Sequence, residues 1–267
     1  MPATPQDGLD YPLLLQHLDD ARTRFDVDWL AECESTNTVL LERAARGAPS
    51  GSVLVTDRQT AGRGRRGRRW LSSPDCSLTF SLLWRLPPAI SSAGLSLAVG
   101  LAVAQALENL GIQGIGLKWP NDIWQHGRKL GGVLIEVAFD HEGLGLIIGI
   151  GLNLRRDPEW QHHLDQASAA LGDDGAQFHR EIVLGSVLRQ LAKILDCFGK
   201  EGFTPLRDAW CVRNTLLGQA VRISSENGEH LGICGDVAAD GALILHVNCG
   251  AHLLITSGDV SLAPIQT

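Results

Sequence analysis

The sequence predicts an α+β fold: a mixed, largely antiparallel sheet with helices, followed by a small C-terminal SH3-like β-barrel. Two long segments, 92–110 and 178–198, repeat apolar residues every three to four positions, which is the period of an amphipathic or buried helix. Between them lie β-like runs separated by short glycine-containing turns, a pattern typical of an antiparallel meander. After Gly218 the helical period gives way to β-like runs about ten residues apart, the spacing of a small all-β domain.

The elements expected in the larger part follow from these periods and from their caps. Ser35 precedes an apolar-periodic run that stops at Gly47, as in a helix with an N-terminal serine and a C-terminal glycine. In the strand predicted over 76–86, Leu78, Phe80 and Leu82 face one way. In chain order the predicted elements are a helix over 11–25, the helix after Ser35, strands 51–56 and 76–86, the helix 92–110, strands 116–119, 122–124, 132–139 and 144–154, and helices 178–198 and 204–213.

The C-terminal part contains tight-turn pairs between its β-like runs. Asn227-Gly228 and Asp240-Gly241 are such pairs, and about 50 residues of this pattern fit a β-barrel of SH3 size. We therefore predict two domains, residues 1–215 and 216–267, with the boundary near Thr215. The β-like runs are 221–223, 231–233, 243–245 and 253–255.

Composition excludes several classes of protein. The chain has 267 residues and a net charge of −7, which does not favour a dedicated nucleic-acid binder. Six cysteines are scattered without a C-x-x-C pair, so we expect free thiols in a reducing compartment and no zinc site. The N-terminal residues do not resemble a signal peptide, and the longest apolar stretch, 95–107, is too short and mixed to span a bilayer. We expect a cytoplasmic protein without a membrane partner.

The most informative segment is the arginine loop, Gly62 to Trp70. Five arginines fall within seven residues of an acidic protein, and such a cluster is unfavourable unless anions lie nearby. Its three glycines permit close approach of backbone N–H groups to a ligand, and arginine binds carboxylate and phosphate in a planar, bidentate way. No Walker motif occurs, and the G-x-G-x-x-G match lacks the strand-to-helix context of a dinucleotide site. The alternative is a solvated basic loop or a nucleic-acid contact.

Two further motifs contain candidate ligand-binding groups. The segment 118–122 combines a lysine, a tryptophan, a proline turn, Asn121 and Asp122; on its own it is equally consistent with an ordinary Asx turn. Lys129 precedes two glycines at the entry to a buried strand, where it could neutralise charge that develops on a phosphate, or could be an exposed strand-end lysine. In the segment 149–153, Asn153 could reach a nucleotide, or the two glycines could mark a bulge.

Taken together and in order, these motifs resemble those of the biotin–protein ligases. The resemblance is carried by Ser35-Thr36-Asn37 and by the segments 59–70, 118–122, 128–132 and 149–153. It implies a catalytic domain like that of the class II synthetases, with an SH3-like domain after it. It also implies ATP-dependent formation of a biotinyl-adenylate and transfer of biotin to a lysine of a biotin carboxyl carrier domain of a carboxylase.

The resemblance also implies roles for individual residues. Lys129 and Arg65 would be catalytic. The residues expected to bind biotin are Ser35, Thr36, Asn37, Gln59, Arg63, Gly64, Arg65, Lys129 and Gly132. The residues expected to bind the nucleotide are Arg65, Arg66, Trp70, Asn121, Asp122, Lys129 and Asn153, with Trp70 stacked on the adenine. ATP and biotin would be substrates and Mg²⁺ a cofactor; Asp122 is a candidate metal ligand, although the sequence does not determine the metal site.

One departure from some relatives concerns DNA. Some family members carry an N-terminal winged-helix domain that represses transcription. Only 34 residues precede Ser35 here, so we expect a monofunctional ligase with no DNA partner. A homodimer is possible, because open strand edges in the meander could pair between subunits.

Three other functions remain as alternatives. One is a catalytically idle relative that merely binds biotin, against which Lys129 and the arginine loop argue. A lipoate or octanoate ligase shares the fold but needs a long acyl tunnel, whereas Ser35, Thr36 and Gln59 favour the polar head group of biotin. A non-catalytic nucleic-acid-binding module would need a basic stripe beyond residues 63–69, which the sequence lacks.

Overall fold

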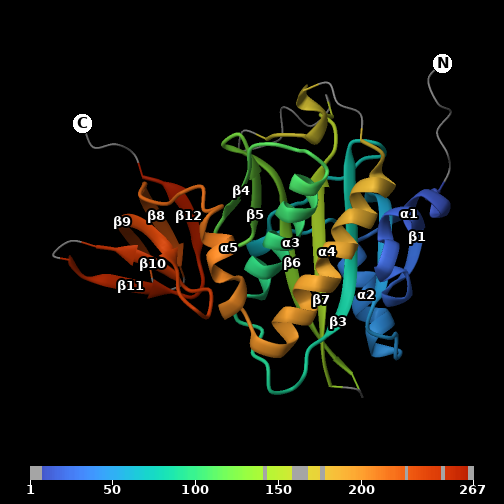
Figure 1. The fold of residues 1–267 in the computed structure, drawn as a ribbon, viewed down its shortest axis with the longest axis horizontal. Helices are drawn as coiled ribbons and strands as arrows, with labels where there is room; N and C mark the ends of the chain where they lie inside the picture. Colours follow the sequence, from blue (N-terminus) through green and yellow to red (C-terminus); the bar gives the residue numbers. More distant parts are fainter. Residues whose placement is uncertain are drawn as a thin grey trace.

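The computed structural model describes residues 8–140, 143–157, 168–174, 178–225, 228–247 and 250–263. Its larger part is built on a seven-stranded mixed sheet with the order β1-β2-β3-β7-β6-β5-β4 (Figure 1). The strands are β1 (Asp26–Cys33), β2 (Ser52–Gln59), β3 (Ser77–Arg85), β4 (Ile115–Lys118), β5 (Asp122–Gln125), β6 (Arg128–Asp140) and β7 (Gly143–Asn153). The predicted meander is confirmed: β4 to β7 pair antiparallel in chain order.

Strand β1 is the strand of this sheet that the sequence did not predict. It pairs parallel to β2 at the edge of the sheet, and this is the one parallel pair among the described strands of that sheet. None of its residues is buried, and three of its eight are acidic, a composition depleted in strands and suited to an exposed edge. The chain crosses from β1 to its parallel partner β2 through helix α2. Local sequence patterns do not predict such a pairing.

The other edge of the sheet is covered. The amide of Leu117 in β4 donates to the Arg213 carbonyl at 2.7 Å, and the amide of Thr215 donates to the Leu117 carbonyl at 3.0 Å. The meander therefore does not present β4 as an open edge at that residue, contrary to our expectation. A homodimer stays a prediction, and pairing through this position would require residues 213–215 to move.

Helices cover the two faces of the sheet unequally. Helices α1 (Tyr11–Leu18), α3 (Leu95–Asn109) and α4 (Arg180–Glu201) pack together on one face, where the large core lies (Figure 1). Helix α3 is buried on nearly all sides, as expected of a helix between a sheet and another helix. It begins three residues later than predicted because Gly94, with φ of 78°, lies outside the helical region. The predicted helix 11–25 continues beyond α1 as a 3-10 helix, Asp19–Arg24.

Among the described helices of the larger part, α2 (Thr36–Ala45) is the one that packs on the opposite face. A small core joins Leu40 and Ala44 of this helix to Leu54, Leu83 and Ile147 of the sheet. Because side chains alternate across a strand, the residues two and four positions before Leu83 and after Ile147 share this face. The nearer residues lie against the first turn of α2 and the farther ones lie beyond it, where the sheet becomes the floor of the cleft described below.

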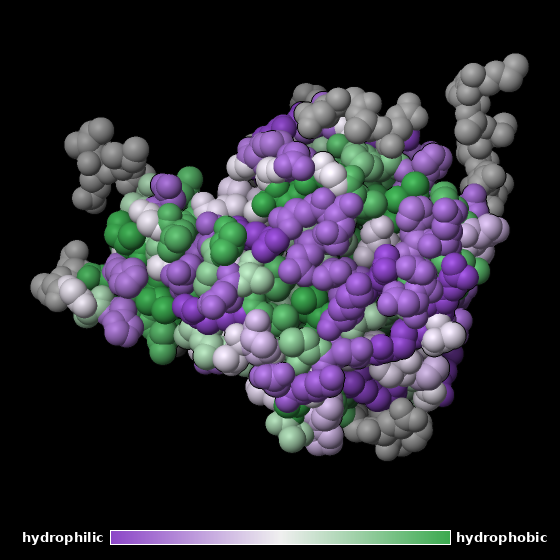
Figure 2. All heavy atoms as spheres, viewed as in Figure 1, coloured by the Kyte–Doolittle hydropathy of each residue, from purple (hydrophilic) through white to green (hydrophobic). Residues whose placement is uncertain are grey.

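The C-terminal part is a five-stranded antiparallel sheet with the order β11-β10-β9-β8-β12. Its strands are β8 (Ala220–Ser225), β9 (Gly228–Val237), β10 (Leu243–His246), β11 (His252–Ile255) and β12 (Asp259–Leu262), and it follows the 3-10 helix Thr204–Leu206 and helix α5 (Arg207–Cys211). The SH3-like expectation is confirmed, with β12 as a fifth strand. Apolar side chains on β9 and β11, such as Leu231 and Leu254, remain exposed, and hydrophobic patches are visible on this lobe in Figure 2.

Two further expectations concern thiols and membranes. The five cysteines within the described residues are free, and burial raises the pKa of the Cys234 thiol to about 11. Cys249 lies outside the described residues. Across the described ranges, no helix has the length and apolar character that crossing a bilayer requires.

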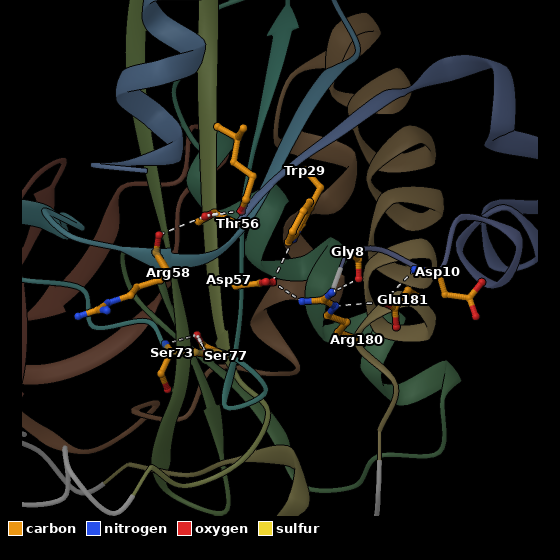
Figure 3. A network of polar contacts seen from close by, with 11 residues as sticks. Gly8, Asp10, Trp29, Thr56, Asp57, Arg58, Ser73, Ser77, Arg180 and Glu181 are labelled. Carbon is orange, nitrogen blue, oxygen red and sulfur yellow. Dashed lines mark hydrogen bonds and ion pairs between the residues drawn. The ribbon is translucent and has the colours of Figure 1, made fainter. Parts of the chain in front are cut away.

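A polar network connects the N-terminal segment, β1, β2 and α4 (Figure 3). Arg180, at the start of α4, is hydrogen-bonded to both the Asp57 carboxylate and the Gly8 carbonyl. The Trp29 indole donates to the same Asp57 carboxylate at 3.1 Å. Arg180 and Asp57 are only 16% and 18% exposed, so this ion pair is poorly screened. The ion pair fixes Asp57 in β2, two residues before Gln59 at the end of that strand.

We expect Arg180→Ala to lower the free energy of unfolding by about 2–4 kcal/mol, because it leaves the Asp57 carboxylate partly buried without its cation. Urea denaturation measures this change. Arg189→Ala is the control: it removes exposed ion pairs to Asp19 and Asp20 from the same helix and should cost at most about 1 kcal/mol. Equal losses in the two variants would contradict a structural role for the Asp57 pair.

Candidate active site

A cleft of about 520 Å³ opens on the half of the sheet that α2 leaves uncovered. Its wall includes the N-terminal end of α2, the arginine loop, the turn between β4 and β5, and residues of β8 and β12. The predicted site residues that line it are Ser35, Thr36, Asn37, Gln59, Arg63, Gly64, Arg65, Arg66, Trp70, Asn121, Asp122, Lys129 and Gly132. The two predicted residues farthest apart in the sequence, Ser35 and Gly132, are separated by 97 positions (132 − 35), and the fold brings them into one cleft.

Asn153 is the one predicted site residue that does not line this cleft. Its side-chain amide donates to the Ala169 carbonyl at 3.0 Å and so joins the end of β7 to the following segment. A nucleotide contact by Asn153 stays a prediction.

At one end of the cleft, hydroxyl and amide groups form a connected cluster around the start of α2. Ser35 occupies the N-cap position, but its hydroxyl makes no capping hydrogen bond, and the first helical amide, Thr36 N–H, donates to Gln59 Oε1 at 2.7 Å. The Ser81 hydroxyl lies 2.6 Å from both Thr36 Oγ1 and Asn37 Oδ1. Ser35, Thr36, Asn37 and Ser81 are buried and Gln59 is half-buried, so their hydrogen-bonding directions are fixed before a ligand arrives.

The same cluster extends to the arginine loop through Glu136. Asn37 Nδ2 donates to Glu136 Oε2 at 2.7 Å, and Arg63 Nη2 lies 3.1 Å from both oxygens of that carboxylate. A continuous chain of polar contacts therefore runs from the start of α2 to the first arginine of the loop.

Two glycines of β7 make room for side chains of the site. A Cβ atom at Gly149 would overlap the Asn37 amide, and one at Gly151 would overlap the Trp70 indole. Trp70 also donates from its indole nitrogen to Thr79 Oγ1 at 3.1 Å. The glycines of the segment 149–151 therefore let an amide and an aromatic ring pack directly against the sheet, and the strand pairs there without a bulge.

The arginine loop is folded back on itself. The Gly64 amide donates to the Arg68 carbonyl at 2.7 Å, and the Trp70 amide donates to the Gly62 carbonyl at 3.0 Å. Arg66 and Gly67 both have positive φ at the tip, where glycine is favoured. Arg65 is directed into the cleft, 3.4 Å from Asn121 Oδ1, and burial lowers the pKa of its guanidinium. A loop of this shape presents several cations to one volume.

At the opposite end of the cleft, two lysines share one carboxylate. Lys129 Nζ lies 2.6 Å from Asp122 Oδ1, and Lys118 Nζ lies 3.7 Å from Asp122 Oδ2. The pKa of Lys118 is lowered overall. Burial lowers it most, the neighbouring Asp122 raises it, and the Lys129 ammonium lowers it. Gly132 lies against this group, since a Cβ there would be 3.6 Å from Asp122 Oδ1. The cluster carries a net positive charge, as a site for an anionic group requires.

Comparison with known proteins places these features in a family. The model of the Biotin/lipoate A/B protein ligase family matches residues 29–153, and that of the Biotin protein ligase C terminal domain matches residues 216–263. The biotin--[acetyl-CoA-carboxylase] ligase of Mycobacterium tuberculosis is 35% identical over 271 residues, covering 96% of this chain and 98% of that protein. The chain belongs to the biotin protein ligase family.

Other members of the biotin protein ligase family agree in sequence and in structure. The bifunctional ligase/repressor BirA of Salmonella typhimurium is 32% identical over 97% of this chain and 82% of its own length. The Aquifex aeolicus biotin protein ligase, solved in complex with biotin and ATP, has a TM-score of 0.79 and 31% identity, covering 89% of this chain and 99% of that chain.

Within this biotin protein ligase fold, the structure adds groups that the sequence motifs did not indicate. Ser81 connects Thr36 to Asn37, Glu136 pairs with Arg63, and Asp259 comes from the C-terminal sheet. A signal for Ser81 was present: it alternates with Phe80 and Leu82 on the polar side of β3. Glu136 and Asp259 gave no local signal, because their partners are distant in the sequence.

We expect Gly151→Ala to displace the Trp70 indole and to lower the free energy of unfolding by about 1–3 kcal/mol, the usual cost of overpacking. Urea denaturation measures the cost, and a crystal structure of the variant locates the ring. Gly199→Ala is the control, because a Cβ there would make only an ordinary 3.7 Å contact with Pro87. An unchanged stability together with an unmoved indole would show that Gly151 is not required for this packing.

Proposed function

We propose that this chain activates biotin with ATP as biotinyl-5′-AMP and then transfers biotin to a lysine of a biotin carboxyl carrier domain. The observation that carries the proposal is the division of one cleft into a buried, neutral, hydrogen-bonding end and a cationic end. Biotin has a neutral polar ring at one end and a carboxylate at the other, so it matches this division. Membership of the ligase family supports the same reaction.

At the neutral end, the groups around Ser81 would bind the ureido ring of biotin. The ring has two N–H donors and a carbonyl acceptor, and the cluster offers hydroxyl and amide groups of both kinds. Lipoate and octanoate have no such polar head group, and burying this cluster against an alkyl chain would leave its hydrogen bonds unsatisfied. The cluster therefore favours biotin over the acids used by the sister ligases. We propose that the biotin-binding residues are Ser35, Thr36, Asn37 and Gln59, with Arg63 and Gly64 closing over them. Ser81 is fully buried and does not line the cleft, so we propose that it positions Thr36 and Asn37.

At the cationic end, Lys129 and Arg65 would act on the reacting groups. An oxygen of the biotin carboxylate attacks the α-phosphorus of ATP, and the bond from that phosphorus to the bridging oxygen breaks with release of pyrophosphate. Both reactants are anions, so positioned cations supply the main stabilisation of the transition state. We propose that Trp70, Asn121, Asp122 and Arg66 hold the nucleotide, with Trp70 stacked on the adenine.

The second step needs no nucleophile from the enzyme. The carrier lysine amine attacks the carbonyl carbon of the mixed anhydride, the carbon–oxygen bond to the phosphate breaks, and AMP leaves while the amine loses a proton. Lys129 and Arg65 would stabilise the phosphate charge of the leaving AMP. The loop over the cleft would keep water from the anhydride until the carrier arrives.

A magnesium ion fits the donor set only if the nucleotide supplies most of its ligands. Among the described residues, no three His, Cys, Asp or Glu side chains converge on one point. Asp122 would be the protein ligand, in keeping with magnesium sites that use one or two carboxylates plus phosphates. When bound, the ion would screen the charge of the triphosphate.

The relatives' names support the carrier assignment, since the Mycobacterium tuberculosis and Paracoccus denitrificans proteins are both named for ligation of acetyl-CoA carboxylase. We further propose a cytoplasmic, monofunctional ligase without a DNA partner, in keeping with the net charge of −7. The domain boundary is proposed near Thr215. There the chain ends its pairing with Leu117 of β4 and continues toward β8, the first strand of the C-terminal sheet.

We expect Lys129→Ala to slow biotinyl-adenylate formation at least about hundredfold, because it removes a cation from the reacting phosphate. The test measures ATP-dependent transfer of biotin to a purified carrier domain, with lipoate and octanoate run in parallel. Lys193→Ala, which removes an exposed lysine of α4, is the matched control. Transfer of lipoate or octanoate but not biotin would overturn the substrate assignment, and an unaffected Lys129→Ala would overturn the role of the lysine.

We expect Ser81→Ala to raise the KM for biotin about tenfold with little change in kcat, because Ser81 positions Thr36 and Asn37, which we assign to ground-state binding of biotin and not to the reacting groups. Steady-state kinetics at saturating ATP measure both constants. Ser77→Ala is the control on the same strand, since its hydroxyl bonds only with Ser73 among the described residues. A rise in KM for Ser77→Ala of the same size would attribute the effect to strand distortion.

A further inference from the structure

Three arginines of the loop converge on a turn of the C-terminal sheet. Arg68 Nη2 lies 2.6 Å from Asp259 Oδ2, and Arg66 Nη1 lies 3.5 Å from the same oxygen. Arg65 Nη1 lies 3.4 Å from the Gly258 carbonyl oxygen. These contacts cross more than 190 residues of sequence and connect the two sheets over the cleft.

The Asp259 carboxylate lies against the arginines at and beyond the tip of the loop, where it offsets their mutual repulsion. Five guanidinium groups repel one another when the loop folds over the cleft, and ordering the loop also costs conformational entropy. Glu136 pairs with the first arginine only, from the side of the catalytic sheet. The Asp259 side chain is 21% exposed, so its attraction to Arg66 and Arg68 is less screened than that of a fully solvated carboxylate.

We propose that Asp259 is a positioning residue that holds the arginine loop closed, so that the biotinyl-adenylate is retained until the carrier domain arrives. The inference rests on the proposed function and gives the C-terminal sheet a part in it. Asp259 acts through the arginines and not on the reacting atoms. Its loss should therefore change how fast the intermediate escapes more than how fast it forms.

Glu136 and Asp259 hold different parts of the loop. Arg63, held by Glu136, lies next to the hydrogen-bonded cluster that we assign to biotin, so that contact affects binding of the acid. Arg66 and Arg68 lie at and beyond the tip of the loop, and Asp259 fixes that tip against the C-terminal sheet. Without Asp259 the loop would stay anchored at its first arginine while its tip could move away from the cleft.

The test measures escape of the intermediate from the full-length protein. The complex is formed with labelled biotin and ATP, freed of excess ligand, and diluted into unlabelled biotin, and the released biotinyl-adenylate is followed with time. We expect Asp259→Asn to release it about five times faster than wild type, as for loss of one partly buried ion pair. Glu229→Gln is the control: it removes a carboxylate that pairs with Arg222 in the same sheet, and its release rate should equal that of wild type.

A charge exchange separates attraction from shape. In the double variant Arg68→Asp/Asp259→Arg the opposite charges are retained in reversed order, and release should be slower than in either single variant. Raising the salt concentration should speed release from wild type and have less effect on Asp259→Asn. If Asp259→Asn fails to fold, Arg68→Gln tests the same contact from the loop, where the side chain is 57% exposed.

The outcomes distinguish this inference from the proposed function. If wild type forms no biotinyl-adenylate, the proposed function is wrong and the inference is wrong with it. If wild type forms and retains the intermediate and Asp259→Asn retains it equally well, only the role of Asp259 is overturned. A raised KM for ATP with unchanged release would also overturn it, because the carboxylate would then act on nucleotide binding.

Discussion

The cleft depends on one geometric constraint: side chains alternate across β-strands, and α2 covers only half of one sheet face. On that face, Leu83 and Ile147 pack under the helix. Two residues further along the same strands, the same alternation places Ser81 and Gly149 against the first turn of α2, and four residues further it places Thr79 and Gly151 beside Trp70. The same strand pair is therefore apolar where it supports a helix and polar or side-chain-free where it faces a ligand.

Electrostatics imposes the second constraint. The chain has a net charge of −7, yet its cleft collects the arginine loop and the two lysines that share Asp122. Bringing these cations together is unfavourable unless carboxylates or ligand anions offset their repulsion. Three strands supply the carboxylates: the consecutive strands β5 and β6 and, far from them in the sequence, β12. Charge pairing thereby links the formation of the site to the packing of the C-terminal sheet against the catalytic part.

The elements that the sequence predicted best were those with strong local periods. The buried helices and the meander needed only their own apolar spacing, and the tight-turn pair Asp240-Gly241 marked a boundary between strands by its backbone preference. Strand β1 was missed because an edge strand with three acidic residues has no apolar alternation to detect. The expectation of open strand edges in the meander did not include the cover at Leu117 of β4, because the covering residues, 213–215, follow about a hundred positions later.

By itself, the sequence determined which chemical groups are available: an arginine-rich loop, a lysine before two glycines, and hydroxyl and amide groups at a helix start. Those features are local, so residue type and spacing suffice to identify them. Only the tertiary structure decided which of them meet, that Asn153 lies outside the cleft lining, and that Ser81, Glu136 and Asp259 complete the network. The reason is physical: a hydrogen bond or ion pair depends on distance in space, and the strand order that sets this distance is a property of the whole chain.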